Sequence, residues 1–397
     1  MTQTQKLLIA IGVVAATGIA ANRFVPAGVG GPGEACRRYQ DEARSTCYSE
    51  LLSNRLRQHG VADAVATLDA LAAADPDVAE HAHEFAHGIG IEAFSVSPDI
   101  VNTFTACGDG FSSGCRHGVI QAYFESRDQV TQPEVEALCQ PFKQSGMSRW
   151  VLFQCVHGMG HGLTMLYGHD LPRALKDCDL LADGWDRESC YGGAFMESVI
   201  NATAPHHPAT MLAMHSHHHM SAGSAFKALD PADPLYPCSI MADRYLHACY
   251  QMQTSVMLNL NHGDIGDAAK SCERAPAQVR AICFQSLGRD ITSYAKPPRD
   301  PQKTADMCHE ASEPNRPACY FGAVKALVDW TATTPAAFAF CGLVANEAGG
   351  QTCYHALGEE IATLLATIPE REAQCIRAQE PTAIAACRQG AGIPSPR

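Results

Sequence analysis

The sequence lacks any run of basic residues. Its 29 lysines and arginines are outnumbered by 42 aspartates and glutamates, which gives a formal net charge of −13 at pH 7. A surface with this charge repels the phosphate backbone of nucleic acids. Nucleic acid is therefore excluded as a partner.

Closely spaced Cys-x2-Cys pairs are also absent, which excludes a zinc ribbon. Cysteine itself is abundant, with 18 residues that form nine neighbouring pairs along the chain. The pairs alternate regularly, with 8 to 16 residues inside a pair and 22 to 60 residues between pairs. In an exported protein, this spacing predicts nine local disulfides. The predicted bridges are Cys36–Cys47, Cys107–Cys115, Cys139–Cys155, Cys178–Cys190, Cys238–Cys249, Cys272–Cys283, Cys308–Cys319, Cys341–Cys353 and Cys375–Cys387.

Export is indicated by the N-terminus. One lysine, Lys6, precedes an uncharged stretch from Leu7 to Ala21. That length and flank are typical of a signal peptide, although the stretch is also close to the minimum for a membrane span. Residues 1–30 are therefore interpreted as a cleaved signal peptide or an uncleaved signal anchor. We expect a periplasmic or extracellular protein that touches the membrane only through such an anchor.

The second cysteines of most neighbouring pairs lie 34 to 40 residues apart, which indicates a repeat. A period near 35 is typical of helical hairpins that stack into a solenoid. Phe85 takes the place of the second cysteine in one unit that has no cysteine pair. The sequence predicts an all-α solenoid of about ten helical hairpins, most of them stapled by one local disulfide. We expect N-terminal repeats over 31–200, an insertion over 201–237 and C-terminal repeats over 238–390.

One cysteine pair per hairpin, with Leu-Gly following the cysteine at Cys283–Gly288 and Cys353–Gly358, resembles the Sel1-like repeats of secreted, cysteine-rich bacterial proteins. The spacing of Cys107 and Cys115 adds to this resemblance. The resemblance covers most of residues 36–387 at the level of architecture. It implies a bacterial envelope location and a concave surface that binds a ligand, and it implies no catalytic residue.

Histidine recurs at one position of the repeat. We number each unit from its second cysteine, or from Phe85 in the unit without cysteines, so that the residue two places later is at position +2. His87, His117 and His157 occupy position +2 in three successive units, whereas later units have Gly, Gln or Phe there, and one has His355. His83 and His161 lie one helical turn from His87 and His157, on the same helix face. These five residues are predicted to bind a transition metal. The alternative is that they are partly buried polar residues that pack between hairpins.

Three carboxylates are candidate ligands or catalytic bases: Glu84, Glu92 and Glu197. Glu92 and Glu197 share position +7 of the repeat. Glu84 completes an H-E-x-x-H motif, which in zinc hydrolases supplies two ligands and a base. The motif is short enough to occur by chance, and helical repeats are not the usual scaffold for it.

The insertion is rich in histidine and methionine, and His215, His217 and His219 are candidate ligands within it. Thioether and imidazole groups together suit copper. The segment is interpreted either as a copper site, as a lid over the histidine row, or as a polar loop with histidines of no particular role. After residue 250, residues such as Arg289 and Glu360 are expected to be ordinary helix-surface residues.

The sequence therefore favours an exported protein that binds copper, zinc or iron, either as a metalloenzyme of the oxidase or hydrolase type or as a copper-handling protein. The alternative hypothesis is a disulfide-stapled scaffold whose groove binds a protein or cell-wall partner and whose histidines are structural.

Overall fold

The computed structural model of the protein describes residues 33–127, 129–143, 147–203, 226–295 and 299–394. Regular secondary structure in these residues is helical, apart from one isolated bridge between Asp230 and Asp233. The all-α prediction is confirmed. The predicted signal segment over 1–30 and most of the insertion fall outside the described residues.

Nine long helices each begin near the second cysteine of a repeat or near Phe85. They are α4 (Ala82–Val96), α6 (Gly114–Glu125), α8 (Arg149–Leu166), α10 (Gly184–Thr203), α12 (Asp243–Leu260), α14 (Ala277–Tyr294), α16 (Arg316–Asp329), α18 (Gly350–Leu364) and α20 (Pro381–Gly390).

Shorter helices lie between the long ones. They are α5 (Ile100–Ala106), α7 (Gln132–Leu138), α9 (Leu171–Cys178), α13 (Ile265–Glu273), α15 (Pro301–Cys308), α17 (Pro335–Leu343) and α19 (Ile368–Cys375). Three further α-helices precede α4, namely α1 (Asp41–His59), α2 (Val61–Ala74) and α3 (Pro76–Glu80). The 3-10 helices are η1 (Cys36–Arg38), η2 (Phe111–Ser113), η3 (Gln140–Lys143), η4 (Cys238–Ile240), η5 (Glu313–Asn315) and η6 (Ile376–Ala378).

Several short helices begin with a capping residue followed by proline. The Asp170 side chain caps α9 by accepting a hydrogen bond from the Arg173 backbone N–H, and a proline follows in the first turn. Thr334 and Pro335 begin α17 in the same way, without the side-chain bond. Proline suits a first turn because its missing N–H has no acceptor there, so these residues set the start of each hairpin.

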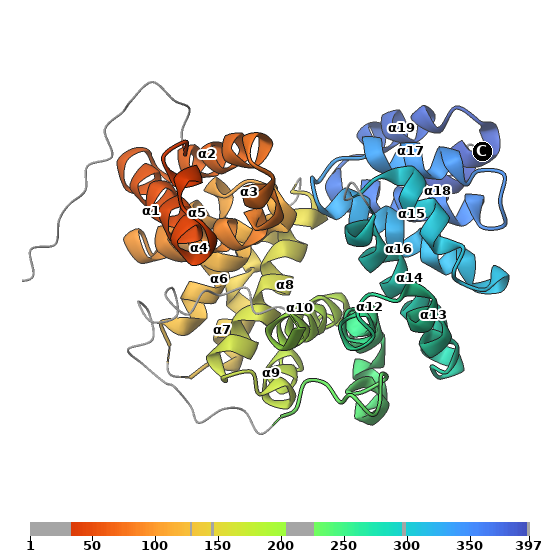
Figure 1. The fold of residues 1–397 in the computed structure, drawn as a ribbon, viewed down its shortest axis with the longest axis horizontal. Coiled ribbons are helices and arrows are strands. Elements are labelled where there is room, and N and C mark those ends of the chain that lie inside the picture. Colours follow the sequence, from red (N-terminus) through yellow and green to blue (C-terminus); the bar gives the residue numbers. More distant parts are fainter. Residues whose placement is uncertain (1–32, 128, 144–146, 204–225, 296–298, 395–397) are drawn as a thin grey trace, which may run out of the picture.

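Each long helix packs against the next one along the chain, from α4 to α20. Figure 1 shows the result as an arc, with α1 to α5 at one upper end, α10 and α12 at the bottom, and α15 to α19 at the other upper end. The two halves also touch. Helix α18 contacts α8, and the Ser112 backbone N–H donates a 3.4 Å hydrogen bond to the Trp330 carbonyl.

All nine predicted disulfides are present, and no cysteine is free. Their Cα atoms lie 5.4 to 5.9 Å apart, in the usual range for a disulfide. Each bridge joins a short helix, or the residues that end it, to the long helix that follows. In the chain-entropy view, a loop of this length contributes roughly 2–3 kcal/mol to stability. Disulfides in this number indicate an oxidising compartment, as expected for an exported protein.

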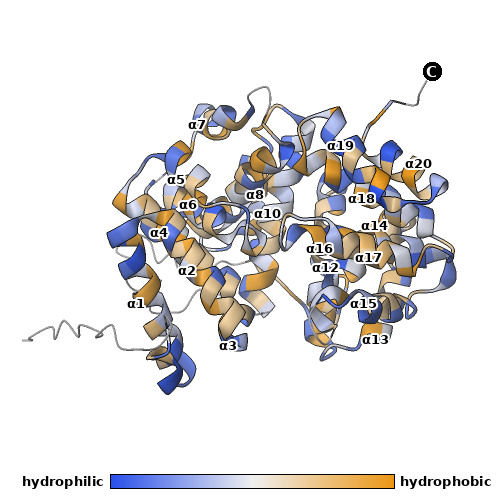
Figure 2. Cartoon of the chain, turned by 90° about the horizontal axis from the view of Figure 1, so that it is seen from above, coloured by the Kyte–Doolittle hydropathy of each residue, from blue (hydrophilic) through white to orange (hydrophobic). Residues whose placement is uncertain are grey.

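The core lies where helices meet. Figure 2 shows hydrophobic residues on the helix faces turned toward neighbouring helices, while α1 carries a hydrophilic outer stretch. The aromatic residue after the second cysteine is buried in every unit that has one: Tyr48, Tyr191, Tyr250, Phe284, Tyr320 and Tyr354. No helix in the described part of the chain is long and apolar enough to cross a membrane.

Glycines bring four pairs of long helices unusually close together. In each pair, a glycine at position +5 of the first helix faces a carbonyl of the second, and a glycine at position +3 of the second faces a carbonyl of the first. A Cβ atom at any of these positions would overlap that carbonyl oxygen. The pairs are Gly90 with Gly118 (α4 and α6), Gly160 with Gly193 (α8 and α10), Gly288 with Gly322 (α14 and α16), and Gly358 with Gly390 (α18 and α20).

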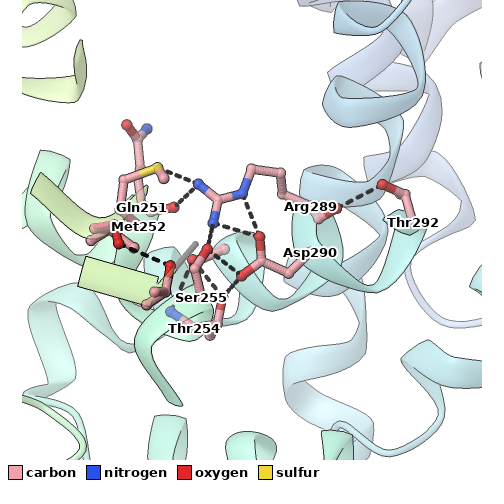
Figure 3. A network of polar contacts seen from close by, with 10 residues as sticks. Gln251, Met252, Thr254, Ser255, Arg289, Asp290 and Thr292 are labelled. Carbon is pink, nitrogen blue, oxygen red and sulfur yellow. Dashed lines mark hydrogen bonds and ion pairs between the residues drawn. The ribbon is translucent and has the colours of Figure 1, made fainter. Parts of the chain in front are cut away.

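Helices α12 and α14 meet through hydroxyl groups instead of glycines. Thr254, at position +5, and Ser286, at position +3, place their hydroxyl oxygens 2.6 Å apart. Asp290 accepts hydrogen bonds from Thr254 and Ser255, and the Arg289 guanidinium donates to Asp290 and to the Gln251 carbonyl (Figure 3). Arg289 and Asp290 therefore join two helices, and the prediction that such residues are ordinary surface residues is wrong for them.

The glycine contacts yield a direct test of helix packing. Replacing Gly322 by alanine should force α14 and α16 apart, because the new Cβ would overlap the Gln285 carbonyl. We expect a loss in the free energy of unfolding on the order of 3 kcal/mol, measured by urea denaturation with disulfides intact. Gly342, in α17, is the matched control, because a Cβ there meets nothing within 4 Å. Gly342→Ala should be neutral or slightly stabilising, and equal losses in both variants would contradict the packing argument.

Candidate metal centre

Three successive long helices bring five histidine side chains together. Position +2 is occupied by His87 on α4, His117 on α6 and His157 on α8. The ring centroid of His117 lies 5.8 Å from that of His87 and 5.4 Å from that of His157. His83 and His161 extend this row on α4 and α8, with centroids 4.8 Å and 5.0 Å from His87 and His157. The rings therefore face a common region, as the repeat register predicts. We call these five residues the imidazole cluster.

Within the imidazole cluster, three residues form the group most suited to one ion. The ligating atoms of His83, His87 and His117 all lie within 4.8 Å of one another. Metal–nitrogen bonds of about 2.0–2.1 Å bring the ligand atoms of one tetrahedral ion to roughly 3–4 Å from one another, so the rings would have to move closer by on the order of 1 Å. Small side-chain movements would therefore complete the coordination.

The cluster is shielded from water. His87, His117, His157 and His161 have exposed fractions between 0% and 7%, and His83 is half-buried. Polar rings at this depth are costly unless their nitrogens are paired or bound. Their hydrogen bonds therefore indicate what the cluster holds.

Several rings use one nitrogen to donate to a fixed acceptor. His83 Nδ1 lies 2.7 Å from the Phe111 carbonyl oxygen, and His161 Nδ1 lies 2.9 Å from a carboxylate oxygen of Glu197. A carbonyl and a carboxylate only accept, so in both rings Nδ1 carries the proton and Nε2 carries the lone pair. The lone pair is what a metal ion needs, and a donor bond at the opposite nitrogen is what orients metal-ligating histidines in general.

Two glutamine side chains serve the same purpose. His117 Nε2 lies 2.8 Å from Gln154 Oε1, and His87 Nδ1 lies 3.4 Å from Gln121 Oε1. The Gln121 amide orientation is fixed because its nitrogen donates to Glu125. His87 thus donates from Nδ1 to Gln121, and His117 donates from Nε2 to Gln154.

Within the imidazole cluster, three rings each have a buried nitrogen with no hydrogen-bond partner among the described residues: His117 Nδ1, His157 Nδ1 and His161 Nε2. Leaving one buried polar atom unsatisfied typically costs about 1–3 kcal/mol. Three such atoms in neighbouring rings are a strong sign that the cluster is built to bind something that accepts lone pairs.

Burial keeps these rings neutral. It lowers the pKa of His83, His117, His157 and His161, and the positive charge that neighbouring histidines would carry lowers the pKa of the first three further. The pKa of His161 falls to about 4. Neutral imidazole is the metal-binding form, so the cluster is ready to bind at pH 7 without losing protons.

The three candidate carboxylates have different surroundings. Glu197 is fully buried and contacts His161, and its other oxygen lies 3.9 Å from His169. Glu92 accepts hydrogen bonds from Ser53 and Arg57 on α1. Glu92 and Glu197 share one position of the repeat, but Glu197 contacts His161 of the imidazole cluster whereas Glu92 contacts α1.

Glu84 completes the H-E-x-x-H motif, but its surroundings do not match a hydrolytic base. The Glu84 carboxylate pairs instead with His81, at 3.4 Å. Burial raises the pKa of Glu84, partly offset by His81.

Sequence reasoning missed the residues that orient the rings. Gln154, Gln121 and the Phe111 carbonyl carry no motif, although Gln121 shares position +6 with His161. His169 was also missed. The candidate ligands His215, His217 and His219 lie outside the described residues.

Comparisons with protein-family models, curated proteins and solved structures find no match to this chain. The likeness to Sel1-like repeats therefore stays a resemblance in architecture. The function must be argued from the imidazole cluster itself.

The lowered pKa values predict how the stability of the metal-free protein depends on pH. Unfolded imidazoles take up protons near pH 6.5, whereas folded His161 stays neutral down to about pH 4. The unfolded state therefore gains protons first, and the free energy of unfolding should fall as pH drops below 6.5. Between pH 7.5 and 5, His161 alone should cost about 2 kcal/mol in urea denaturation. His161→Gln should reduce this loss, and an unchanged pH dependence would contradict the assignment.

Proposed function

We propose that this chain is an exported transition-metal-binding protein whose ion is held by His83, His87 and His117, with His157 and His161 adjoining. One observation carries the proposal. Rings of the imidazole cluster donate to fixed acceptors outside the cluster, and buried nitrogens of His117, His157 and His161 have no hydrogen-bond partner among the described residues. Histidines that only pack between helices have no need for this arrangement.

The donor set narrows the choice of metal. Neutral imidazole nitrogens suit copper, zinc and iron, whereas magnesium and calcium prefer oxygen ligands. Glu197 supplies a buried negative charge that would offset part of the charge of a bound ion. Among these three metals, copper has additional support because the insertion is rich in histidine and methionine.

The surroundings of the cluster favour some reaction classes over others. Hydrolysis of the H-E-x-x-H type needs a glutamate base beside the ion, and Glu84 pairs with His81 instead. An oxidase-type metalloenzyme or a copper-handling protein needs no such base. We therefore favour these two functions over a hydrolase.

The proposal includes the location and shape of the protein. Residues 1–30 act as a signal peptide or signal anchor that delivers the chain to the periplasm or the cell exterior. The stacked hairpins form a short solenoid. A structural role for the histidines, in a scaffold that binds a protein or cell-wall partner, is the alternative that the next experiment separates.

His87→Gln tests the ligand assignment. Glutamine occurs naturally at position +2 in other units, as Gln251 and Gln285, so the fold should tolerate it. Loss of one imidazole from the triad should weaken metal binding on the order of 100-fold or more. The measurement is metal content and affinity after addition of Cu(II), Zn(II) or Fe(II), on protein purified without a histidine tag.

His355→Gln is the matched control for this variant. His355 shares position +2 but lies on α18, where its ring is partly exposed and pairs with Glu359. The His355→Gln variant should bind metal as tightly as the unaltered protein. If the unaltered protein takes up no copper, zinc or iron, the metal-binding proposal is wrong and the scaffold alternative stands.

Glu197→Gln tests the role of the buried carboxylate. The amide oxygen can still accept the hydrogen bond from His161, but the negative charge is lost. We expect metal affinity to fall about 10- to 100-fold, as for other partners that orient metal-ligating histidines. Glu92→Gln removes the carboxylate at the same repeat position, where it contacts α1. It should leave affinity unchanged, and equal effects of the two substitutions would refute this role.

A further inference from the structure

The imidazole cluster contains two matching pairs of histidines. His83 and His87 lie four residues apart on α4, with ring centroids 4.8 Å apart and planes inclined by 58°. His157 and His161 have the same spacing on α8, at 5.0 Å and 65°. Each pair has the geometry by which one helix offers two imidazoles to an ion. Helices α4 and α8, which both pack against α6, therefore each carry one such pair of histidines.

His117 on α6 lies between the two pairs. Its centroid is 6.1 Å and 5.8 Å from His83 and His87, and 5.4 Å and 5.1 Å from His157 and His161. The group whose ligating atoms lie within 4.8 Å of one another joins His117 to the α4 pair and leaves out the α8 pair. One ion at that group would therefore leave His157 and His161 without a role.

The orientation of His161 also separates it from the first ion. Its ring is stacked on that of His117, with planes inclined by only 21°. A metal ion lies in the plane of each imidazole that binds it, so two stacked rings do not direct their lone pairs at the same point. His161 is therefore oriented toward a different position from His117.

The α8 pair carries its own evidence of a ligand. His157 Nδ1 and His161 Nε2 are both buried and have no hydrogen-bond partner among the described residues. The Nδ1–H of His161 donates to Glu197, which fixes the lone pair on Nε2 and places a negative charge nearby. The α4 pair shares the donor bond at Nδ1, since His83 and His87 donate to the Phe111 carbonyl and to Gln121, but the carboxylate countercharge belongs to the α8 pair.

From these observations we infer that the imidazole cluster takes two metal ions, the second bound by His157 and His161. This inference rests on the proposed function, since the second ion is of the same class: a transition-metal ion that accepts imidazole nitrogen. Its remaining coordination positions are open to water or to a small incoming ligand. Two neighbouring ions of this kind would allow both to act on one bound molecule.

The test counts ions per chain in the full protein. Its background variant replaces the six histidines of the insertion, which could bind copper themselves, by serine: His206, His207, His215, His217, His218 and His219. In this background, one double variant carries H83Q and H87Q, and the other carries H157Q and H161Q. Glutamine stands naturally at the equivalent positions of other units, as Gln351, Gln251 and Gln121. Thermal unfolding and intact disulfides confirm that each variant is folded, and H355Q serves as the matched control.

We expect two Cu(II) or Zn(II) ions per chain in the background and in H355Q, and one in each double variant, by metal analysis after gel filtration. Electron paramagnetic resonance gives a second readout. Two neighbouring Cu(II) ions should couple and lose signal intensity, whereas each double variant should show the full signal of an isolated Cu(II).

Other outcomes overturn the inference in distinguishable ways. A background that saturates at one ion, whether or not H157Q/H161Q retains it, rules out the second ion while the proposed function survives. A background that binds no ion rejects both the second ion and the proposed function. Two ions per chain in H157Q/H161Q would show that the second ion lies elsewhere.

Discussion

Close approach of helix backbones through glycine is the constraint on which the rest of this structure depends. In four helix pairs, a reciprocal pair of glycines lets each backbone reach the other where any side chain would overlap a carbonyl oxygen. Gly118 faces the carbonyl of His87, and Gly193 faces that of His157. The glycines thus lie directly beside the histidines at position +2. A wider spacing between the helix backbones would move the rings of neighbouring helices apart, so that they could no longer bind one ion together.

Such a cluster works against the stability of the fold that holds it. Neutral imidazoles with unpartnered nitrogens are costly in a core, and glycines inside helices weaken those helices. Nine short disulfide loops oppose these costs by restricting the unfolded chain. The bridges also secure the contacts between long helices, since the carbonyls that face the glycines at position +5 belong to Cys115, Cys190, Cys319 and Cys387. The scaffold can therefore keep a strained, polar interior that hydrophobic packing alone would not favour.

Much of this could be predicted from the sequence, because cysteine spacing reports local connectivity and a repeat reports which positions are equivalent. All nine disulfides and the five converging histidines follow from those two facts. The limits have physical causes. The register could not distinguish Glu92 from Glu197, because it does not report which side chains surround a position: Glu92 contacts Ser53 and Arg57 on α1, and Glu197 contacts His161 on α8. Glu360 was expected at the surface and is 6% exposed, held by Lys325 from the neighbouring helix.

The C-terminal repeats show what the same positions do without a cluster. Position +6 carries His161 on α8 but Lys325 on α16, and position +7 carries Glu197 on α10 but Glu360 on α18. Burial alone would lower the pKa of Lys325, but Glu360 and Glu359 raise it above its usual value, so the ammonium remains charged and paired. Charges on this face of the repeat thus satisfy one another within the C-terminal half. The N-terminal half presents neutral rings there, with one buried carboxylate, and these rings leave nitrogens without partners. In the C-terminal half the buried polar groups of the scaffold are therefore paired with one another, whereas in the N-terminal half buried imidazole nitrogens remain available to bind an ion.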